Sequence, residues 1–118
     1  MRCLRSLGGW LLALSMATTS GALAHAHLKT SVPSDGSILG AAPSELVLEF
    51  SEAARLTALW IERSGAEKQK VSPLPQEPRT RIAVPLVKLA PGDYVVSWRV
   101  LGADGHVVPG KIRFTLRQ

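Results

Sequence analysis

Apolar and polar residues alternate with a period of two along much of this chain, and Pro and Gly residues separate the alternating stretches. In one such stretch, Leu46, Leu48 and Phe50 share a face. Alternation of this kind is typical of a β-strand that buries one side against a core. The same pattern predicts further strands at residues 57–62 and 80–85.

The clearest pair of strands comes last in the chain. One face of each is apolar, formed by Tyr94, Val96, Trp98 and Val100 in the first strand and by Ile112, Phe114 and Leu116 in the second. Lys111, Arg113 and Arg117 are expected to face water. Because the eight Pro residues leave few windows for three helical turns, the only helical element expected is a short turn near residues 53–56.

These strands predict an all-β fold, an immunoglobulin-like Greek-key β-sandwich. The turn at residues 89–94, with Pro91 and Gly92 before a core strand, is common in such sandwiches. Residues 64–79 are rich in Lys, Gln, Pro and Glu and are expected to form an exposed connection.

The first 24 residues read as a secretory signal peptide. Arg2 and Arg5 precede an apolar run at residues 7–16, and the small residues of 22–24 form a cleavage site. Cleavage there would leave residues 25–118 as one small exported domain that begins with His25. The stretch from Ala24 to Ala26 is itself a small-x-small site, so cleavage directly before His27 is the alternative.

Sulfur and charge narrow the possible functions. Cys3, Met1 and Met16 all lie in the predicted signal, so the mature domain would have no thiol, thioether or disulfide. The whole chain has 14 basic and 9 acidic residues, without a run of basic ones. Neither a nucleic-acid surface nor a polybasic membrane anchor is indicated, and a monomer is expected.

The three His residues suggest a metal site. An N-terminal His25 would offer its α-amine and its ring Nδ1 to one ion, in a six-membered chelate ring. Asp104 and His106 lie in the loop between the last two strands, and this loop can meet the start of the chain if the first strand pairs within the sandwich. Nitrogen-rich ligands with a carboxylate and no sulfur suit Cu(II).

Simpler interpretations of the same residues stay open. His106 could be a solvated loop residue, Asp104 a turn former, and Glu52 the cap of a following turn. His27 could be exposed without a role. Alternatively, a terminal amine, two deprotonated amides and the His27 ring could chelate Cu(II) and leave the loop unused. We favour the folded site, because its loop ligands are already positioned and no strand backbone has to be distorted.

Several segments resemble the CopC family of periplasmic copper-resistance proteins, in the family's order: residues 25–37, 42–43, 48–52, 91–100 and 104–106, followed by Gly110. The resemblance implies an immunoglobulin-like sandwich that binds Cu(II) through an N-terminal His, an Asp-x-His pair and a nearby Glu as a ligand or supporting group. The matching positions are His25, Asp104, His106 and Glu52. Some members carry a Met-rich loop for Cu(I), which this chain lacks.

The favoured function is therefore a non-catalytic periplasmic protein that sequesters Cu(II) or delivers it to an inner-membrane transporter of the CopD type. One alternative is a copper-dependent oxidative enzyme with an N-terminal histidine brace, although 94 residues and five aromatic side chains leave little surface for a polymeric substrate. The other alternative is a metal-free structural module.

Overall fold

The computed structural model of the chain describes residues 26–117. Seven β-strands make up this part of the chain, and none of its residues lies in an α-helix. The strands are β1 (Leu28–Val32), β2 (Ser37–Leu39), β3 (Glu45–Arg63), β4 (Gln69–Lys70), β5 (Arg79–Pro85), β6 (Gly92–Gly102) and β7 (Val107–Leu116). Residues 26–117 contain no helix that is long and apolar enough to span a membrane.

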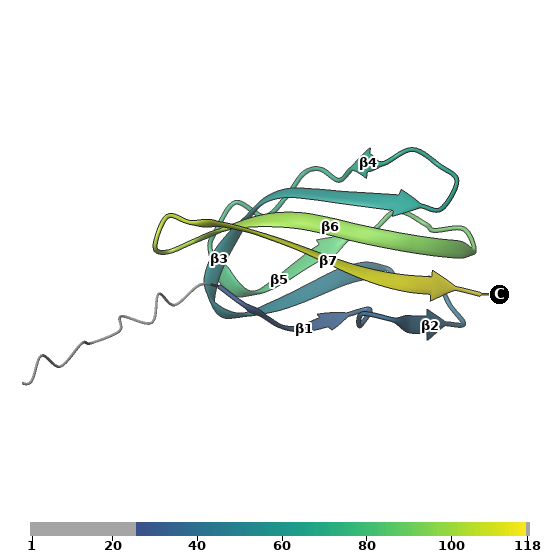
Figure 1. Cartoon of the computed structure of the whole chain (residues 1–118), viewed down its shortest axis with the longest axis horizontal. Helices are drawn as coiled ribbons and strands as arrows, with labels where there is room; N and C mark the ends of the chain where they lie inside the picture. The colour runs from purple at the N-terminus through teal and green to yellow at the C-terminus, as the bar shows by residue number, and fades with distance from the viewer. Residues whose placement is uncertain (1–25, 118) are drawn as a thin grey trace, which may run out of the picture.

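Strand β3 connects the two layers of the molecule. Its first part pairs antiparallel with β1 and β5, and its second part, from Ala54 onward, pairs with β6 and, near its end, with β4. The sheet continues from β6 to β7 and then to β2, which runs parallel to β7. Because β3 bends where it changes partners, one hydrogen-bonded network folds back on itself (Figure 1). The predicted immunoglobulin-like β-sandwich is confirmed.

The core lies between the two layers and is entirely apolar among the described residues. Each apolar face predicted from the alternation is buried: that of Leu46, Leu48 and Phe50 on β3, that of Tyr94, Val96, Trp98 and Val100 on β6, and that of Ile112, Phe114 and Leu116 on β7. Tyr94 and Phe114 are neighbours across β6 and β7, with ring centroids 5.2 Å apart. The basic residues predicted to face water on β7 and after it are exposed.

Two of the predicted elements need correction. The helical turn expected near residues 53–56 is wrong, because these residues continue β3 and pair with the end of β6. Ala54 and Leu56 are buried there, so tertiary packing decides their conformation. The connection at residues 64–79 is largely exposed, as predicted, but it includes the two-residue strand β4.

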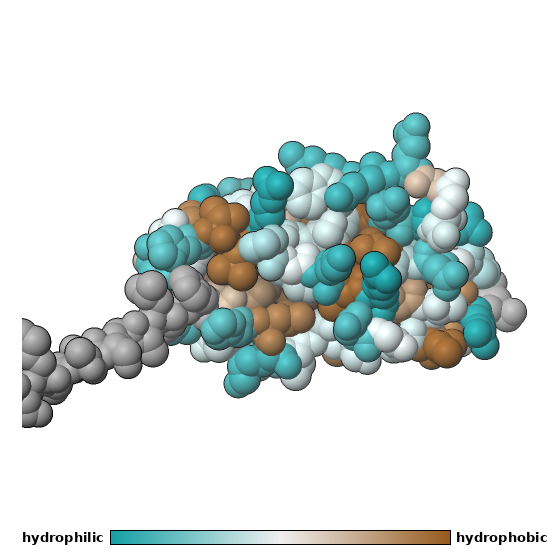
Figure 2. Space-filling view, in the orientation of Figure 1, coloured by the Kyte–Doolittle hydropathy of each residue, from teal (hydrophilic) through white to brown (hydrophobic). Residues whose placement is uncertain are grey.

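On the visible face, small apolar groups lie among polar residues (Figure 2).

Candidate metal centre

The hairpin between β6 and β7 carries two of the predicted ligands on a short, well-defined turn. The N–H of Gly105 donates to the carbonyl of Gly102 at 3.0 Å, and the N–H of Gly102 donates to the carbonyl of His106 at 3.0 Å. Gly105 has a φ of 82°, a left-handed conformation that glycine adopts without a steric penalty. The turn therefore holds residues 103–106 in one arrangement at the end of the sandwich.

Asp104 contacts His106 through both of its carboxylate oxygens. Oδ1 accepts the backbone N–H of His106 at 3.0 Å, and Oδ2 lies 3.4 Å from Nδ1 of the His106 ring. The side chain of Asp104 is 26% exposed and that of His106 is 55% exposed. An imidazole and a carboxylate thus lie next to each other at a surface that an ion can reach.

Gly102 provides the room that this carboxylate occupies. A Cβ atom at position 102 would lie 3.0 Å from Oδ1 of Asp104, closer than side chains normally approach. A residue larger than glycine would therefore push the carboxylate away from its present position. The sequence analysis missed this role, and its only visible signal was a glycine two residues before Asp104.

The segment before β1 is fastened to β3. The N–H of His27 donates to Oγ of Ser51 at 2.9 Å, and the N–H of Ser51 donates to the carbonyl of His27 at 2.8 Å. Ala26 is only 2% exposed, and its side chain packs in the core. The backbone therefore has a defined position from Ala26 onward. His25, the residue before it, lies outside the described residues. Ser51 is a second positioning residue, and no sequence signal pointed to it.

Strand β3 brings the start of the domain and the β6–β7 turn to the same end of the sandwich. Phe50 pairs with Leu28 at the start of β1, whereas Ala54 pairs with Gly102 at the entrance of the turn. Glu52 lies between these two points on the strand and is half-buried. Figure 1 shows the beginning of β1 and the β6–β7 turn at the same end of the molecule.

Among residues 26–117, the structure brings one pair of the predicted ligands into contact. Asp104 and His106 touch, and His27 is held through its backbone. Within residues 26–117, no three His, Cys, Asp or Glu residues gather closely enough to hold a metal ion by themselves. The pair on the turn would need at least one further donor to hold a metal ion.

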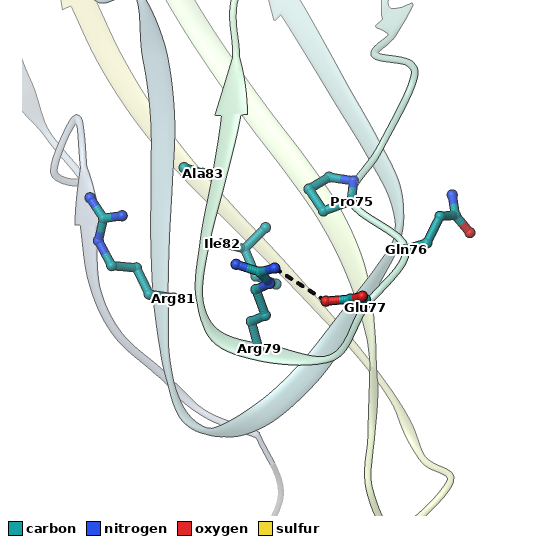
Figure 3. A pocket seen from close by; sticks show the side chains of 7 residues that line it. All are labelled: Pro75, Gln76, Glu77, Arg79, Arg81, Ile82 and Ala83. Carbon is teal, nitrogen blue, oxygen red and sulfur yellow. Dashed lines mark hydrogen bonds and ion pairs between the residues drawn. The ribbon is translucent and has the colours of Figure 1, made fainter.

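A hollow beside β5 provides no competing metal site. It is lined by residues 75–77, 79 and 81–83, none of which is a histidine. In Figure 3 the side chains of Arg79 and Glu77 point toward each other, and the two form an ion pair of 3.1 Å. Both side chains are largely exposed, so this pair stabilises the fold very little.

Comparison with known proteins identifies relatives over nearly the whole described region. Residues 28–117 match the model of the CopC domain. The chain is 32% identical to Protein YobA of Escherichia coli strain K12 over 114 residues, which cover 89% of this chain and 92% of that one. It is 31% identical to Copper resistance protein C of Escherichia coli over 119 residues, with 88% and 90% covered.

A longer relative and a solved structure complete this comparison. The chain is 30% identical to Copper transport protein CutJ of Bacillus subtilis over 98 residues, which cover 79% of this chain but 18% of CutJ. The crystal structure of CopC from Methylosinus trichosporium OB3b superimposes with a TM-score of 0.67 at 29% identity, covering 78% of this chain and 93% of that chain. The resemblance seen in the sequence is thereby confirmed, and the chain belongs to the CopC family.

Proposed function

We propose that this protein binds one Cu(II) ion through His25, Asp104 and His106, outside the cytoplasm, and either sequesters it or passes it on. The observation that carries the proposal is the contact between Asp104 and His106 on a turn at the same end of the sandwich as the segment that follows His25. An N-terminal His25 would add an amine and an imidazole, and so supply the donors that the turn lacks.

The donor set favours Cu(II). Residues 25–118 contain no Cys and no Met, so every available ligand is a nitrogen or oxygen atom. Such ligands suit Cu(II) in a tetragonal field and suit Cu(I) poorly. In a tetragonal field, adjacent ligands lie at right angles around the ion. With bonds of about 2 Å, the ligand atoms are then about 2.8 Å apart. Because Nδ1 of His106 and Oδ2 of Asp104 are 3.4 Å apart, small side-chain movements would allow both residues to bind one ion.

Glu52 is proposed as a supporting residue or weak ligand. It lies on β3 between Phe50, which pairs with the start of β1, and Ala54, which pairs with the entrance of the turn. A carboxylate at this position would orient a neighbouring imidazole or amine by accepting its hydrogen bond, as groups surrounding metal ligands commonly do.

The hydrogen bonding of His27 argues against the amide-chelating alternative. In that mode the amide nitrogen of His27 loses its proton and binds copper. Here the same N–H donates to Ser51, which in turn donates to the carbonyl of His27. Forming the amide chelate would break this attachment and displace the buried Ala26 from the core, whereas the folded site requires neither change.

The match to CutJ supports delivery of the bound ion to a membrane protein. The matching region makes up only 18% of that copper transport protein, so a domain of this kind is joined there to a much larger part. We propose that the present chain, after removal of residues 1–24 as a signal peptide, works in the periplasm as a monomeric, non-catalytic protein that sequesters copper or donates it to a membrane transporter of the CopD type.

Competition titration of the mature protein tests the copper function. We expect one Cu(II) per chain, and binding that is tighter than for Ni(II) and Zn(II), as the Irving–Williams order predicts. The double variant Asp104→Ala, His106→Ala removes two proposed ligands and should lose this binding. Its β-sheet circular dichroism signal should be unchanged, which serves as the control for folding. Equal or tighter binding of Zn(II), or unchanged binding in the double variant, would contradict the proposal.

A further inference from the structure

A basic groove crosses the outer face of β3, β6 and β7. It is a shallow hollow of about 570 Å³, and the side chains that characterise it are Trp60, Lys68, Ser97, Arg99, Pro109 and Lys111. The three cations are exposed, whereas Trp60 is half-buried. The candidate metal centre shares none of these residues.

The strand register explains why these side chains gather. Trp60, Ser97 and Lys111 are partners across β3, β6 and β7, so they form one row across the sheet. Arg99 and Pro109 are partners in the adjacent row of the same outward face. Neighbouring residues of a strand point to opposite faces, so these five side chains share the outward face. Trp98 and Gly110, which lie between them on β6 and β7, form the floor of the groove.

Trp60 lies at the centre of the positive charge. Nζ of Lys68 is 5.1 Å from the centroid of its ring, and the guanidinium of Arg99 is 5.5 Å away. Both distances fall in the range of cation–π attraction, which holds the cations above the indole. No Asp or Glu is found among the described residues that line the groove. Three cations are thus collected in one hollow without a neutralising partner in its lining.

We propose that this groove binds an acidic, extended segment of a partner protein. Carboxylates of such a segment would pair with Lys68, Arg99 and Lys111, and its extended backbone would lie along the hollow. Clusters of basic residues are a recurrent means of recognising acidic motifs, and complementary charge increases both specificity and association rate.

The shape of the surface favours a polypeptide over a lipid bilayer. Proteins that lie on a membrane insert projecting aromatic side chains into the interface. Here Trp60 is half-buried and lies beneath cations in a concave surface, so it is poorly placed to enter a flat bilayer. An extended chain, in contrast, can lie within the hollow.

The groove is also close enough to the β6–β7 turn for a bound partner to reach it. Arg99 precedes Asp104 by five residues, which corresponds to about 17 Å along a strand at about 3.3 Å per residue. A partner docked in the groove would therefore extend to the candidate copper site. Such a partner could then exchange copper with that site. This exchange rests on the proposed function, whereas the binding of an acidic segment does not.

Isothermal titration calorimetry with a model peptide tests the groove. The probe is a ten-residue peptide of Asp, Glu and one Leu, blocked at both ends, added to the mature protein in the presence of a metal chelator. We expect Arg99→Glu and Lys111→Glu each to weaken binding by about tenfold or more. The matched control Lys88→Glu changes the same charge at an exposed position outside the groove and should weaken binding less than twofold.

Each other outcome of this experiment overturns the proposal. Absence of peptide binding would do so, and an equal loss in the Lys88→Glu control would show only general charge attraction. Groove-dependent binding to phosphatidylglycerol vesicles without peptide binding would identify a membrane surface instead. If a charge reversal disturbs folding, the neutral variants Arg99→Gln and Lys111→Gln serve in its place. Copper affinity, measured separately, should be the same in all these variants, so failure of the groove and failure of the copper site are distinguishable.

Discussion

Asp104 holds His106 at two points: its Oδ1 accepts the backbone N–H of His106 at 3.0 Å, and its Oδ2 lies 3.4 Å from the ring Nδ1. One carboxylate therefore fixes both the backbone and the imidazole of the neighbouring candidate ligand. Gly105, between the two residues, has a φ of 82° and closes the turn that carries them by donating its N–H to the carbonyl of Gly102.

Removing this carboxylate should weaken copper binding while the sandwich persists. We expect Asp104→Ala to reduce Cu(II) affinity by about 10–100-fold or more, because it removes a ligand and releases His106. Asp104→Asn retains an acceptor for the His106 N–H but loses the negative charge, so its affinity should be intermediate. Competition titrations against a chelator of known affinity measure both variants, and equal affinities in Asp104→Ala and the unmodified protein would exclude this role.

Gly102→Ala tests whether the position of the carboxylate matters. The new Cβ would lie 3.0 Å from Oδ1 of Asp104, so the carboxylate has to move by several tenths of an ångström. We expect a several-fold loss of Cu(II) affinity. Gly40→Ala is the control, because a Cβ there meets no atom within 4 Å. Equal copper affinity in the two variants would show that the space above Gly102 has no bearing on binding.

Gly110→Ala is expected to destabilise the sandwich through Trp98. A Cβ at position 110 would lie 2.5 Å from two carbons of the Trp98 ring, which is buried across from it on β6. Overpacking of this kind costs about 1–3 kcal/mol in the free energy of unfolding. Urea denaturation followed by tryptophan fluorescence measures the loss. A variant as stable as Gly40→Ala would mean that the ring has room to move.

The strands and the core could be predicted because their apolar residues alternate without interruption. Tyr94, Val96 and Trp98 are buried as their spacing predicts, and the strand predicted at residues 80–85 is β5. The continuation of β3 through residues 51–56 could not be predicted. At this point the strand leaves β1 and β5 and joins β6, so its conformation depends on partners that are distant in the sequence.

The candidate site likewise combines features that could be predicted from local sequence with features that depend on distant parts of the chain. The candidate ligands could be predicted from the sequence as an Asp-x-His pair and an N-terminal histidine. The loop position of the Asp-x-His pair follows from the two strands on either side of it. Attachment of His27 to Ser51 depends on the register between β1 and β3, which local sequence does not encode. The basic groove escaped prediction for a similar reason, since Lys68, Arg99 and Lys111 lie far apart in the chain and meet only in the folded sheet.

An extra residue before His25 should weaken copper binding by orders of magnitude. A preceding Gly would convert the amine into an amide and remove the terminal chelate, but it lies outside the strands and their packing. We therefore expect an unchanged thermal unfolding midpoint together with the loss of affinity. Mass spectrometry of the exported protein should first establish whether the mature chain begins at His25 or His27. Full affinity in the extended protein would show that its amine is not a ligand.

The most direct test of the folded copper site is a comparison of Cu(II) affinity and electron paramagnetic resonance spectra for His106→Ala and His27→Ala. The folded site predicts a sharp loss of affinity and an altered spectrum for His106→Ala, and little change for His27→Ala. Glu52→Gln should lie between them, with a loss of about 10–100-fold. The reverse result, with His27→Ala severe and His106→Ala silent, would establish chelation by the N-terminal amides and contradict the folded site.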